Sequence, residues 1–228
     1  MSNIQITENE SGKYSPEWFY NEAQKPEWIA FIRKADTLHE NFINHFGIEH
    51  LKSLSGKELL TSLFYNDKGN KLNLCYVLEM DKDMREIFGS IAGGAAYKFG
   101  LFFHKKTQSW TCGSPAKPVK LTENEAIQKA EEIRNDLVAG AEIISSFGPL
   151  NSTADYEQLY KQLEHISGIN TVWRMKYYQM LFPILFAPFY GQDIQLDVLH
   201  FLNQTPSEIP FIRMGQIALF SKKCNIPG

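Results

Sequence analysis

Apolar residues recur three and four positions apart over long parts of the chain, which is the spacing of one face of an α-helix. The clearest run begins at Pro26 and stops at Gly47. Proline fits the first turn of a helix, and glycine commonly ends one. The run therefore predicts an amphipathic helix of about 20 residues. Its apolar positions are Trp28, Phe31, Ile32, Ala35, Leu38, Phe42, Ile43 and Phe46.

Capping residues indicate where other helices begin. Thr122 and Glu125 have the spacing of a capping box, as do Ser55 and Glu58, because the hydroxyl and the carboxylate can each bind a free amide of the first turn. The first box predicts a helix that ends before residue 147, and the second predicts one that ends near Tyr65. Further helices are predicted to begin at Pro16 and to cover residues 154–166, 172–182, 196–202 and 211–223.

Between Lys71 and Met80 the pattern changes, because apolar side chains alternate with others. A period of two is typical of a β-strand. Two more strands are predicted at residues 97–104 and 109–112, with Gly89–Gly94 as a loop at the rim of the sheet. The fold class that follows is α+β, with a small, mostly antiparallel sheet packed among several helices and a helix-rich C-terminal half.

The composition is that of a globular protein, with 228 residues of which 43% are hydrophobic. It predicts a flexible tail over residues 1–14 and a single domain over 15–228, with a weak division near 148–153. Three cysteines far apart in the sequence leave one unpaired in any disulfide scheme, as in proteins of the reducing cytoplasm. With no secretory leader and no apolar run of spanning length, the sequence predicts a cytoplasmic location and no membrane partner.

Charge is distributed unevenly along this chain of net charge −3. Between Ile87 and Thr122 there is no Asp or Glu, so the lysines of that segment form a cationic window in an acidic background. Such a surface attracts anions, and nucleic acid is the commonest large anion in a cell. The lysines are Lys98, Lys105, Lys106, Lys117 and Lys120.

No catalytic, metal or cofactor site is predicted. Gly89–Gly94 has the outer spacing of a phosphate-binding loop, but its closing Gly-Lys-Ser/Thr is replaced by Gly-Ala-Ala-Tyr, so we reject nucleotide hydrolysis by this segment. Its glycines either allow positive φ angles and close packing, or let a ligand approach the backbone. The acids between Glu79 and Glu86 suggest a magnesium-dependent nuclease, yet the Glu-x-Lys of such a site is missing. A solvated strand end explains these acids better.

Trp110 is the aromatic residue with two interpretations. It follows Lys105 and Lys106 and precedes Lys117, so its ring either stacks on a base among cations or is buried in the core. Other aromatic residues, at helical spacing near Tyr177, are expected to pack in the core.

Four segments of the sequence carry a resemblance to a known family. They are Phe88-Gly-Ser-Ile-Ala-Gly-Gly-Ala-Ala-Tyr-Lys-Phe-Gly-Leu-Phe, Trp110-Thr-Cys-Gly-Ser-Pro, Val172-Trp-Arg-Met-Lys-Tyr-Tyr-Gln-Met-Leu-Phe-Pro and Arg213-Met-Gly-Gln-Ile-Ala-Leu-Phe. Together they resemble the N-terminal region of McrB-type AAA+ restriction proteins. The resemblance covers roughly residues 28–223, taken as a match of recurrent motifs. It implies a region that precedes a GTP- or ATP-hydrolysing motor and that recognises DNA in several lineages, often at a modified cytosine. Because Walker motifs are missing, the motor is expected on another domain or a partner, together with a nuclease subunit.

The sequence therefore predicts a non-catalytic DNA-recognition module of a restriction or phage-defence system, with a modified cytosine as a candidate target. The alternative is a protein-interaction or oligomerisation domain that docks on a motor or nuclease subunit, which the acidic net charge favours. A small nuclease that uses Glu79 or Asp81 is the weakest interpretation. The predicted nucleic-acid contacts are Lys98, Lys105, Lys106, Trp110, Lys117 and Lys120, and the predicted base pocket or backbone approach is formed by Ser90, Gly93, Gly94, Tyr97 and Ser114.

Overall fold

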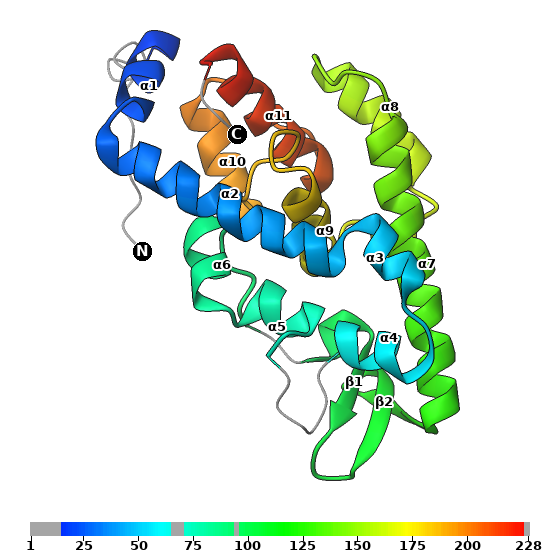
Figure 1. Cartoon of the computed structure of the whole chain (residues 1–228). Helices are drawn as coiled ribbons and strands as arrows, with labels where there is room; N and C mark the ends of the chain where they lie inside the picture. Colours follow the sequence, from blue (N-terminus) through cyan, green and yellow to red (C-terminus); the bar gives the residue numbers. More distant parts are fainter. Residues whose placement is uncertain (1–14, 65–70, 94–95, 226–228) are drawn as a thin grey trace.

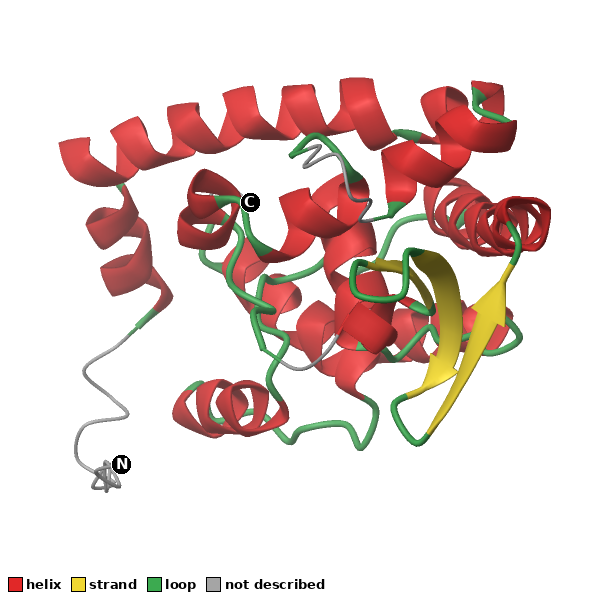
Figure 2. Ribbon diagram, turned by 90° about the horizontal axis from the view of Figure 1, so that it is seen from below, coloured by secondary structure: helices red, strands yellow, loops and turns green. Residues whose placement is uncertain are grey.

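A computed structural model describes residues 15–64, 71–93 and 96–225 of the chain. It shows the α+β fold that the sequence predicts, with a three-stranded antiparallel sheet at one end of a helical body (Figures 1 and 2). The α-helices are α1 (Pro16–Ala23), α2 (Pro26–Phe46), α3 (Ile48–Ser53), α4 (Gly56–Leu63), α5 (Leu74–Glu79), α6 (Lys82–Ile87), α7 (Glu123–Ser146), α8 (Thr153–Leu163), α9 (Val172–Leu181), α10 (Gln192–Phe201) and α11 (Pro210–Lys223). The remaining elements are the 3₁₀ helix η2 (Ala96–Phe99) and the strands β1 (Leu101–His104), β2 (Ser109–Ser114) and β3 (Lys117–Leu121).

The long helix α2 has the predicted bounds. Pro26 lies in its first turn, and the Gly47 amide closes its end on the Ile43 carbonyl at 2.8 Å. Only the C-terminal half packs into the core, where Phe42 and Phe46 are buried next to α9. In Figure 2 the N-terminal half of α2 extends along one side of the molecule, and α1 turns away from its end.

Helix α7 is the element against which much of the fold packs. The capping box of Thr122 and Glu125 is confirmed, because both of its reciprocal hydrogen bonds form. The helix contacts α3, α4, α8, α9 and all three strands. One hydrophobic core continues across residues 148–153, from Leu137 of α7 to Leu159 of α8.

The prediction of a capping box at Ser55 is wrong. The Ser55 side chain makes no hydrogen bond to α4. Gly56 adopts φ +54°, in the left-handed region, so the backbone enters this helix in a conformation that a regular capping box does not have.

The strand predicted between Lys71 and Met80 is also wrong, because the segment forms α5 and leads into α6. The Asn73 side chain accepts a hydrogen bond from the Tyr76 amide (2.9 Å) and so caps α5. Asp81 caps α6 in the same way through the Met84 amide (2.9 Å). Helix α5 is buried on most sides, because α4, α6 and α9 all contact it. A helix buried in this way can carry apolar residues at almost any position, so their alternation does not distinguish a helix from a strand.

The sheet is shorter at its start and longer at its end than predicted. Gly100, with φ +81°, separates η2 from β1, so residues 96–99 are helical rather than extended. Strand β3 was not predicted, because Pro118 and two lysines make it look like a loop. Pro118 is tolerated because β3 is an edge strand, where a missing amide breaks no ladder on the open side.

The C-terminal helices were predicted with bounds close to those observed, except that α10 begins at Gln192 rather than near residue 196. Among the described residues, no helix has both the length and the apolar character needed to cross a membrane. The contact between α11 and α8 is close because Gly215 faces the ring of Tyr156.

Gly215→Ala is expected to lower the free energy of unfolding by about 1–3 kcal/mol, because a Cβ at this position would overlap the buried Tyr156 ring. The measurement is urea-induced unfolding followed by circular dichroism. Gly148→Ala is the matched control, since nothing lies within 4 Å of a Cβ at Gly148. Equal stability of the two variants would contradict the packing described here.

Candidate functional site

The predicted lysine surface is divided by the hairpin. Lys105 and Lys106 lie in the β1–β2 turn, and Lys117 begins β3 at the opposite end of β2. The ends of a six-residue strand are about 17 Å apart. Lys120 pairs with Thr111 and Lys117 with Ser114, so the two side chains project from opposite faces of the sheet. All four are exposed and form no ion pair with another described residue, but they do not share one face.

Lys98 is not available to a phosphate, which corrects its predicted role. Its ammonium group pairs with Glu79 and also donates to the carbonyls of Ile91 (3.0 Å) and Gly93 (2.8 Å). An ammonium group has three donors, and the side chain is only 16% exposed. Lys98 therefore holds the loop 89–93 against α5.

The predicted base pocket does not form around Trp110. The Trp110 ring is buried at 7% exposure and packs edge-on against Phe103, with ring centroids 5.4 Å apart. The interpretation of Trp110 as an exposed base contact is therefore wrong, because the tryptophan faces the core side of the sheet. Tyr97 packs edge-on against Phe102 on the other side, at 4.6 Å.

Of the remaining predicted pocket residues, Ser90 and Gly93 lie in the loop after α6 and Ser114 is the last residue of β2. The Ser90 hydroxyl accepts from the Ala92 amide (3.1 Å), and the Ser114 hydroxyl accepts from the Lys117 amide (3.2 Å). Gly93 has φ +124° with open space where a Cβ would be. Gly94 lies outside the described residues.

The acids considered for a nuclease are each engaged in a structural contact. Asp83 pairs with Lys34 of α2 (2.6 Å) and Glu86 lies 3.7 Å from Lys82, while Asp81 caps α6. Within the described ranges, no group of three His, Cys, Asp or Glu side chains has the arrangement of a metal site.

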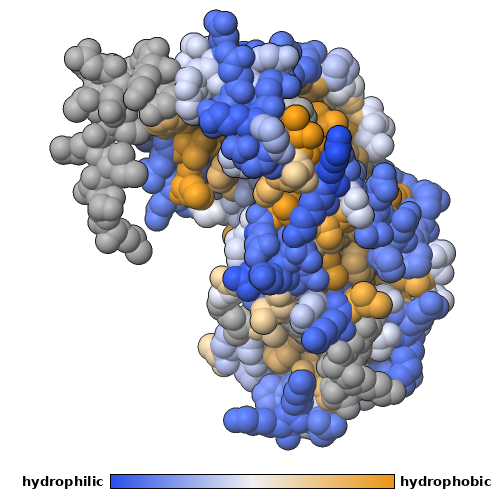
Figure 3. Space-filling model, turned by 60° about the vertical axis from the view of Figure 1, so that its left-hand side comes forward, coloured by the Kyte–Doolittle hydropathy of each residue, from blue (hydrophilic) through white to orange (hydrophobic). Residues whose placement is uncertain are grey.

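An apolar concave surface lies beside α1 and α2, away from the hairpin. It is an apolar groove of about 480 Å³ whose walls are α1 and α2 and whose floor is formed by the end of α6 and the segment after α9. Figure 3 brings this side of the molecule forward and shows apolar surface between polar side chains. We call it the α1–α2 groove. Its apolar and aromatic lining is Trp18, Phe19, Ala23, Trp28, Phe31, Ile32, Ala35, Ile87, Phe88, Pro183 and Pro188.

The apolar stripe of α2 explains why the groove exists. At Phe42 and Phe46 the stripe is covered by the core, with 1% and 3% exposure. Three turns earlier the same stripe is open, with Trp28 45% and Phe31 36% exposed. Lys34 ties α2 to Asp83 of α6, and Phe19 of α1 meets Phe220 of α11 with ring centroids 5.5 Å apart. These two contacts hold α1 and α2 in place as walls of the groove. They do not cover the apolar residues of the N-terminal half of α2.

The groove contains few polar groups. Glu22 pairs with Lys25 at 2.5 Å, whereas Asp36 makes no hydrogen bond or ion pair with another described residue. His39 follows Asp36 by three positions, and its Nε2 is buried without a hydrogen-bond partner among the described residues. A buried polar atom without a partner costs about 1–3 kcal/mol. Asp36 is therefore the carboxylate of the groove lining that has no cation among the described residues.

A buried polar network supports the floor of the groove. The Tyr190 hydroxyl donates to the Phe88 carbonyl (2.7 Å) and lies 2.9 Å from the side-chain amide of Gln179. Next to it, Lys176 donates to the Gly89 carbonyl (2.6 Å), with its ammonium 5.8 Å from the centroid of the Tyr190 ring. Burial, with a smaller effect of Arg85, lowers the pKa of Lys176 to about 8.

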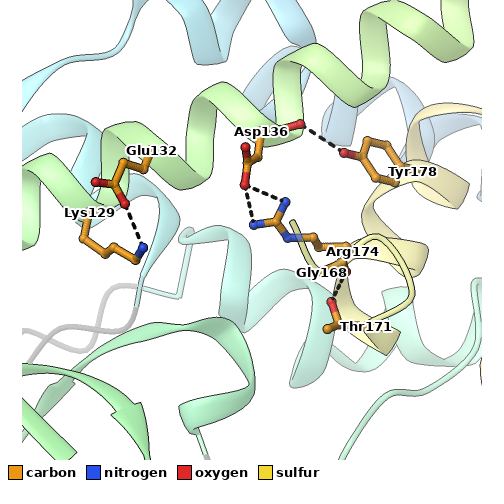
Figure 4. Close-up of polar contacts among 7 residues, drawn as sticks. All are labelled: Lys129, Glu132, Asp136, Gly168, Thr171, Arg174 and Tyr178. Carbon is orange, nitrogen blue, oxygen red and sulfur yellow. Dashed lines mark hydrogen bonds and ion pairs between the residues drawn. The ribbon is translucent and has the colours of Figure 1, made fainter. Parts of the chain in front are cut away.

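A second, polar cleft of about 440 Å³ lies between α7 and the start of α9 (Figure 4). Arg174 donates from both terminal nitrogens to one oxygen of Asp136, at 3.3 Å each. The Tyr178 hydroxyl donates to the Asp136 carbonyl (3.2 Å), and Lys129 pairs with Glu132. Each of these cations already has a carboxylate partner, so the cleft joins α7 to α9 and offers no unpaired charge to an anion.

Comparison with models of protein families, with curated protein sequences and with solved structures finds no match for this chain. The candidate site therefore depends on geometry alone. Sequence reasoning found the α2 stripe but not the groove, since the same spacing describes the covered and the open half of the helix. One feature of the sequence could have indicated the groove, which is that three large aromatic residues, Trp18, Trp28 and Phe31, lie on the first two helices.

Lys176→Met is expected to remove a rise in stability between about pH 8 and pH 10. The folded pKa of about 8 lies below the unfolded value of 10.5, so in this window the unfolded state holds a proton that the folded state has lost. Stability then increases with pH, by at most about 3 kcal/mol for this group. Below pH 8 the group contributes no pH dependence.

The measurement is the free energy of unfolding against pH for the wild type, Lys176→Met and the exposed control Lys161→Met. Above pH 10 the unfolded state loses phenol protons that buried tyrosines such as Tyr190, whose pKa is raised by burial, keep in the folded state, so stability falls again and the comparison is made between pH 8 and pH 10. Parallel curves for the wild type and Lys176→Met would show that Lys176 is not a buried ammonium.

Proposed function

We propose that this protein is a protein-interaction domain and that the α1–α2 groove is its binding surface. The observation that supports it is the apolar stripe of α2, which continues from the core into the groove and is there left uncovered. Large exposed apolar patches are rare on monomeric soluble domains, and where they occur they commonly mark interaction sites. Tryptophan is also the residue most enriched among the energetic anchors of protein interfaces.

The chemistry of the groove fits a protein partner better than a nucleic acid. Its charged lining residues are Glu22 and Asp36, and none is Lys or Arg. A phosphate backbone would be repelled by such a surface and needs cations in return. The resemblance to McrB-type N-terminal regions would make an AAA+ motor or a nuclease subunit the partner, and that assignment remains part of the proposal.

Nucleic-acid contact through the hairpin is the second candidate function. It is favoured by one observation, that Lys105, Lys106, Lys117 and Lys120 are all exposed without an ion pair to another described residue. Lys105 and Lys106 are adjacent in the β1–β2 turn, so they are the pair best placed to meet two neighbouring phosphates. In this function the lysines position a backbone, and base discrimination requires residues other than the buried Trp110.

Phe31→Glu is expected to abolish partner binding, because a carboxylate in the middle of the groove would be desolvated by the partner. Affinity-tagged wild type, Phe31→Glu and the control Ile194→Glu are used to recover the partner from the source cells. Ile194 is 48% exposed on α10, outside the groove. The recovered protein is then purified and titrated against each variant by calorimetry. Equal affinity for wild type and Phe31→Glu would contradict the proposal.

Lys105→Ala/Lys106→Ala tests the second candidate by fluorescence anisotropy with labelled duplexes, unmodified or carrying modified cytosines. If the hairpin binds DNA, the double variant binds all duplexes more weakly, and the slope of log affinity against log salt becomes shallower by about 2. Lys222→Ala/Lys223→Ala, an adjacent exposed pair on α11, is the matched control. An absence of wild-type binding at low salt would eliminate this candidate.

A further inference from the structure

The walls of the α1–α2 groove present side chains to an occupant but few free backbone amides or carbonyls. Most of the lining belongs to α1 and α2, whose amides and carbonyls are used within the helices, and two further lining residues are Pro183 and Pro188, which have no amide hydrogen. The sheet lies at the other end of the body, so no strand edge borders the groove. An extended peptide would bury its own backbone groups there without hydrogen-bond partners, which is unfavourable. A helix satisfies these groups internally.

The length of the groove also suits a helix. Along α2 the lining runs from Trp28 to His39, which is about 16 Å or three turns. The residues follow one another at spacings of three and four, so they form the ridges between which the side chains of a second helix pack. Bound helices of this kind insert apolar residues at positions i, i+3 or i+4, and i+7.

The volume of the groove, about 480 Å³, lies within the range of small-molecule sites, but its walls are more exposed than those of an enclosed pocket. Such sites commonly bury 70–90% of the surface of their ligand, as an order of magnitude. Here the wall residues Trp18, Trp28 and Phe31 are themselves 38%, 45% and 36% exposed. An occupant that lies along the groove and covers these rings would remove far more apolar surface from water.

The charged residues of the groove indicate which charge the occupant carries at the border of its apolar face. Glu22 has its cation in Lys25, but Asp36 has none among the described residues. A positively charged side chain on the occupant would pair with Asp36.

From these observations, and resting on the proposed function, we infer that the groove binds a cationic amphipathic helix of another protein. The apolar face of that helix covers the exposed aromatic residues Trp18, Trp28 and Phe31. A Lys or Arg at the border of its apolar face pairs with Asp36. Recognition thus combines apolar burial, which gives affinity, with a single charge pair, which selects the orientation and the class of helix.

The inference is tested by charge exchange with three labelled peptides of about four turns, stapled because isolated helices of this length are marginal in water. The first has a leucine stripe bordered by lysines, the second has the lysines replaced by glutamates, and the third is the first peptide unstapled and with two prolines in its centre. Each is titrated by anisotropy against the full chain and against Asp36→Lys, Phe31→Glu and Glu40→Lys. Glu40 lies on α2 but outside the groove lining, so it controls for the change in net charge.

The expected result is that the lysine peptide binds the wild type at least 10-fold more tightly than the glutamate peptide. Asp36→Lys reverses this preference, Glu40→Lys leaves it in place, and Phe31→Glu abolishes binding of both peptides. The proline peptide binds at least 10-fold more weakly than the lysine helix, because it cannot satisfy its own backbone.

Other results overturn the inference in distinguishable ways. Equal binding of both charged helices, still lost in Phe31→Glu, excludes the cation and leaves the proposed function intact. Binding of the proline peptide as tightly as the helix excludes a helical occupant. Failure of all peptides, while Phe31→Glu still loses the natural partner, excludes this class of helix but not protein binding by the groove. A concentration-dependent dimer in sedimentation that disappears in Phe31→Glu makes a second copy the occupant.

Discussion

The structure depends on one constraint, which is that α9 is buried on all sides although it carries several polar side chains. From Trp173 to Leu181 every residue of the helix is buried. A buried polar group without a partner is costly, so each polar side chain of α9 must find one on a neighbouring element. Arg174 binds Asp136 of α7, Lys176 binds the carbonyl of Gly89, and Tyr177 binds the carbonyl of Phe46 at 3.0 Å.

These contacts fix the surroundings of the candidate site. The hydrogen bond from Tyr177 holds the C-terminal end of α2, and Lys176 with Tyr190 holds the turn at Phe88 and Gly89. The floor of the groove and the base of its main wall are therefore set by the same buried helix. Among the described residues, the N-terminal half of α2 receives no such hydrogen bond from α9, and its apolar stripe is left exposed at Trp28 and Phe31.

The lysine window shows that a correct count of charges in the sequence does not place those charges on one surface. The segment is as free of acids as the sequence states, but folding uses its members for different purposes. Lys98 forms an ion pair with Glu79 of α5, and Trp110 is buried on the core face of the sheet. A strand places successive side chains on opposite faces, so residues that are close in sequence, such as Lys117 and Lys120, are separated in space. Neither effect is visible in composition.

By itself, the sequence determined the elements that are specified by residues close to one another in the chain. The bounds of α2, the capping box of α7 and the hairpin strands follow from prolines, glycines, caps and turn residues within a few positions of each other. The tertiary structure decided the rest. It made residues 74–79 a helix because burial on most sides erases period, and it left half of the α2 stripe uncovered because α9 anchors only one end. A pattern of apolar residues specifies a face to be covered, but only the packing of the whole chain decides whether the chain itself covers it.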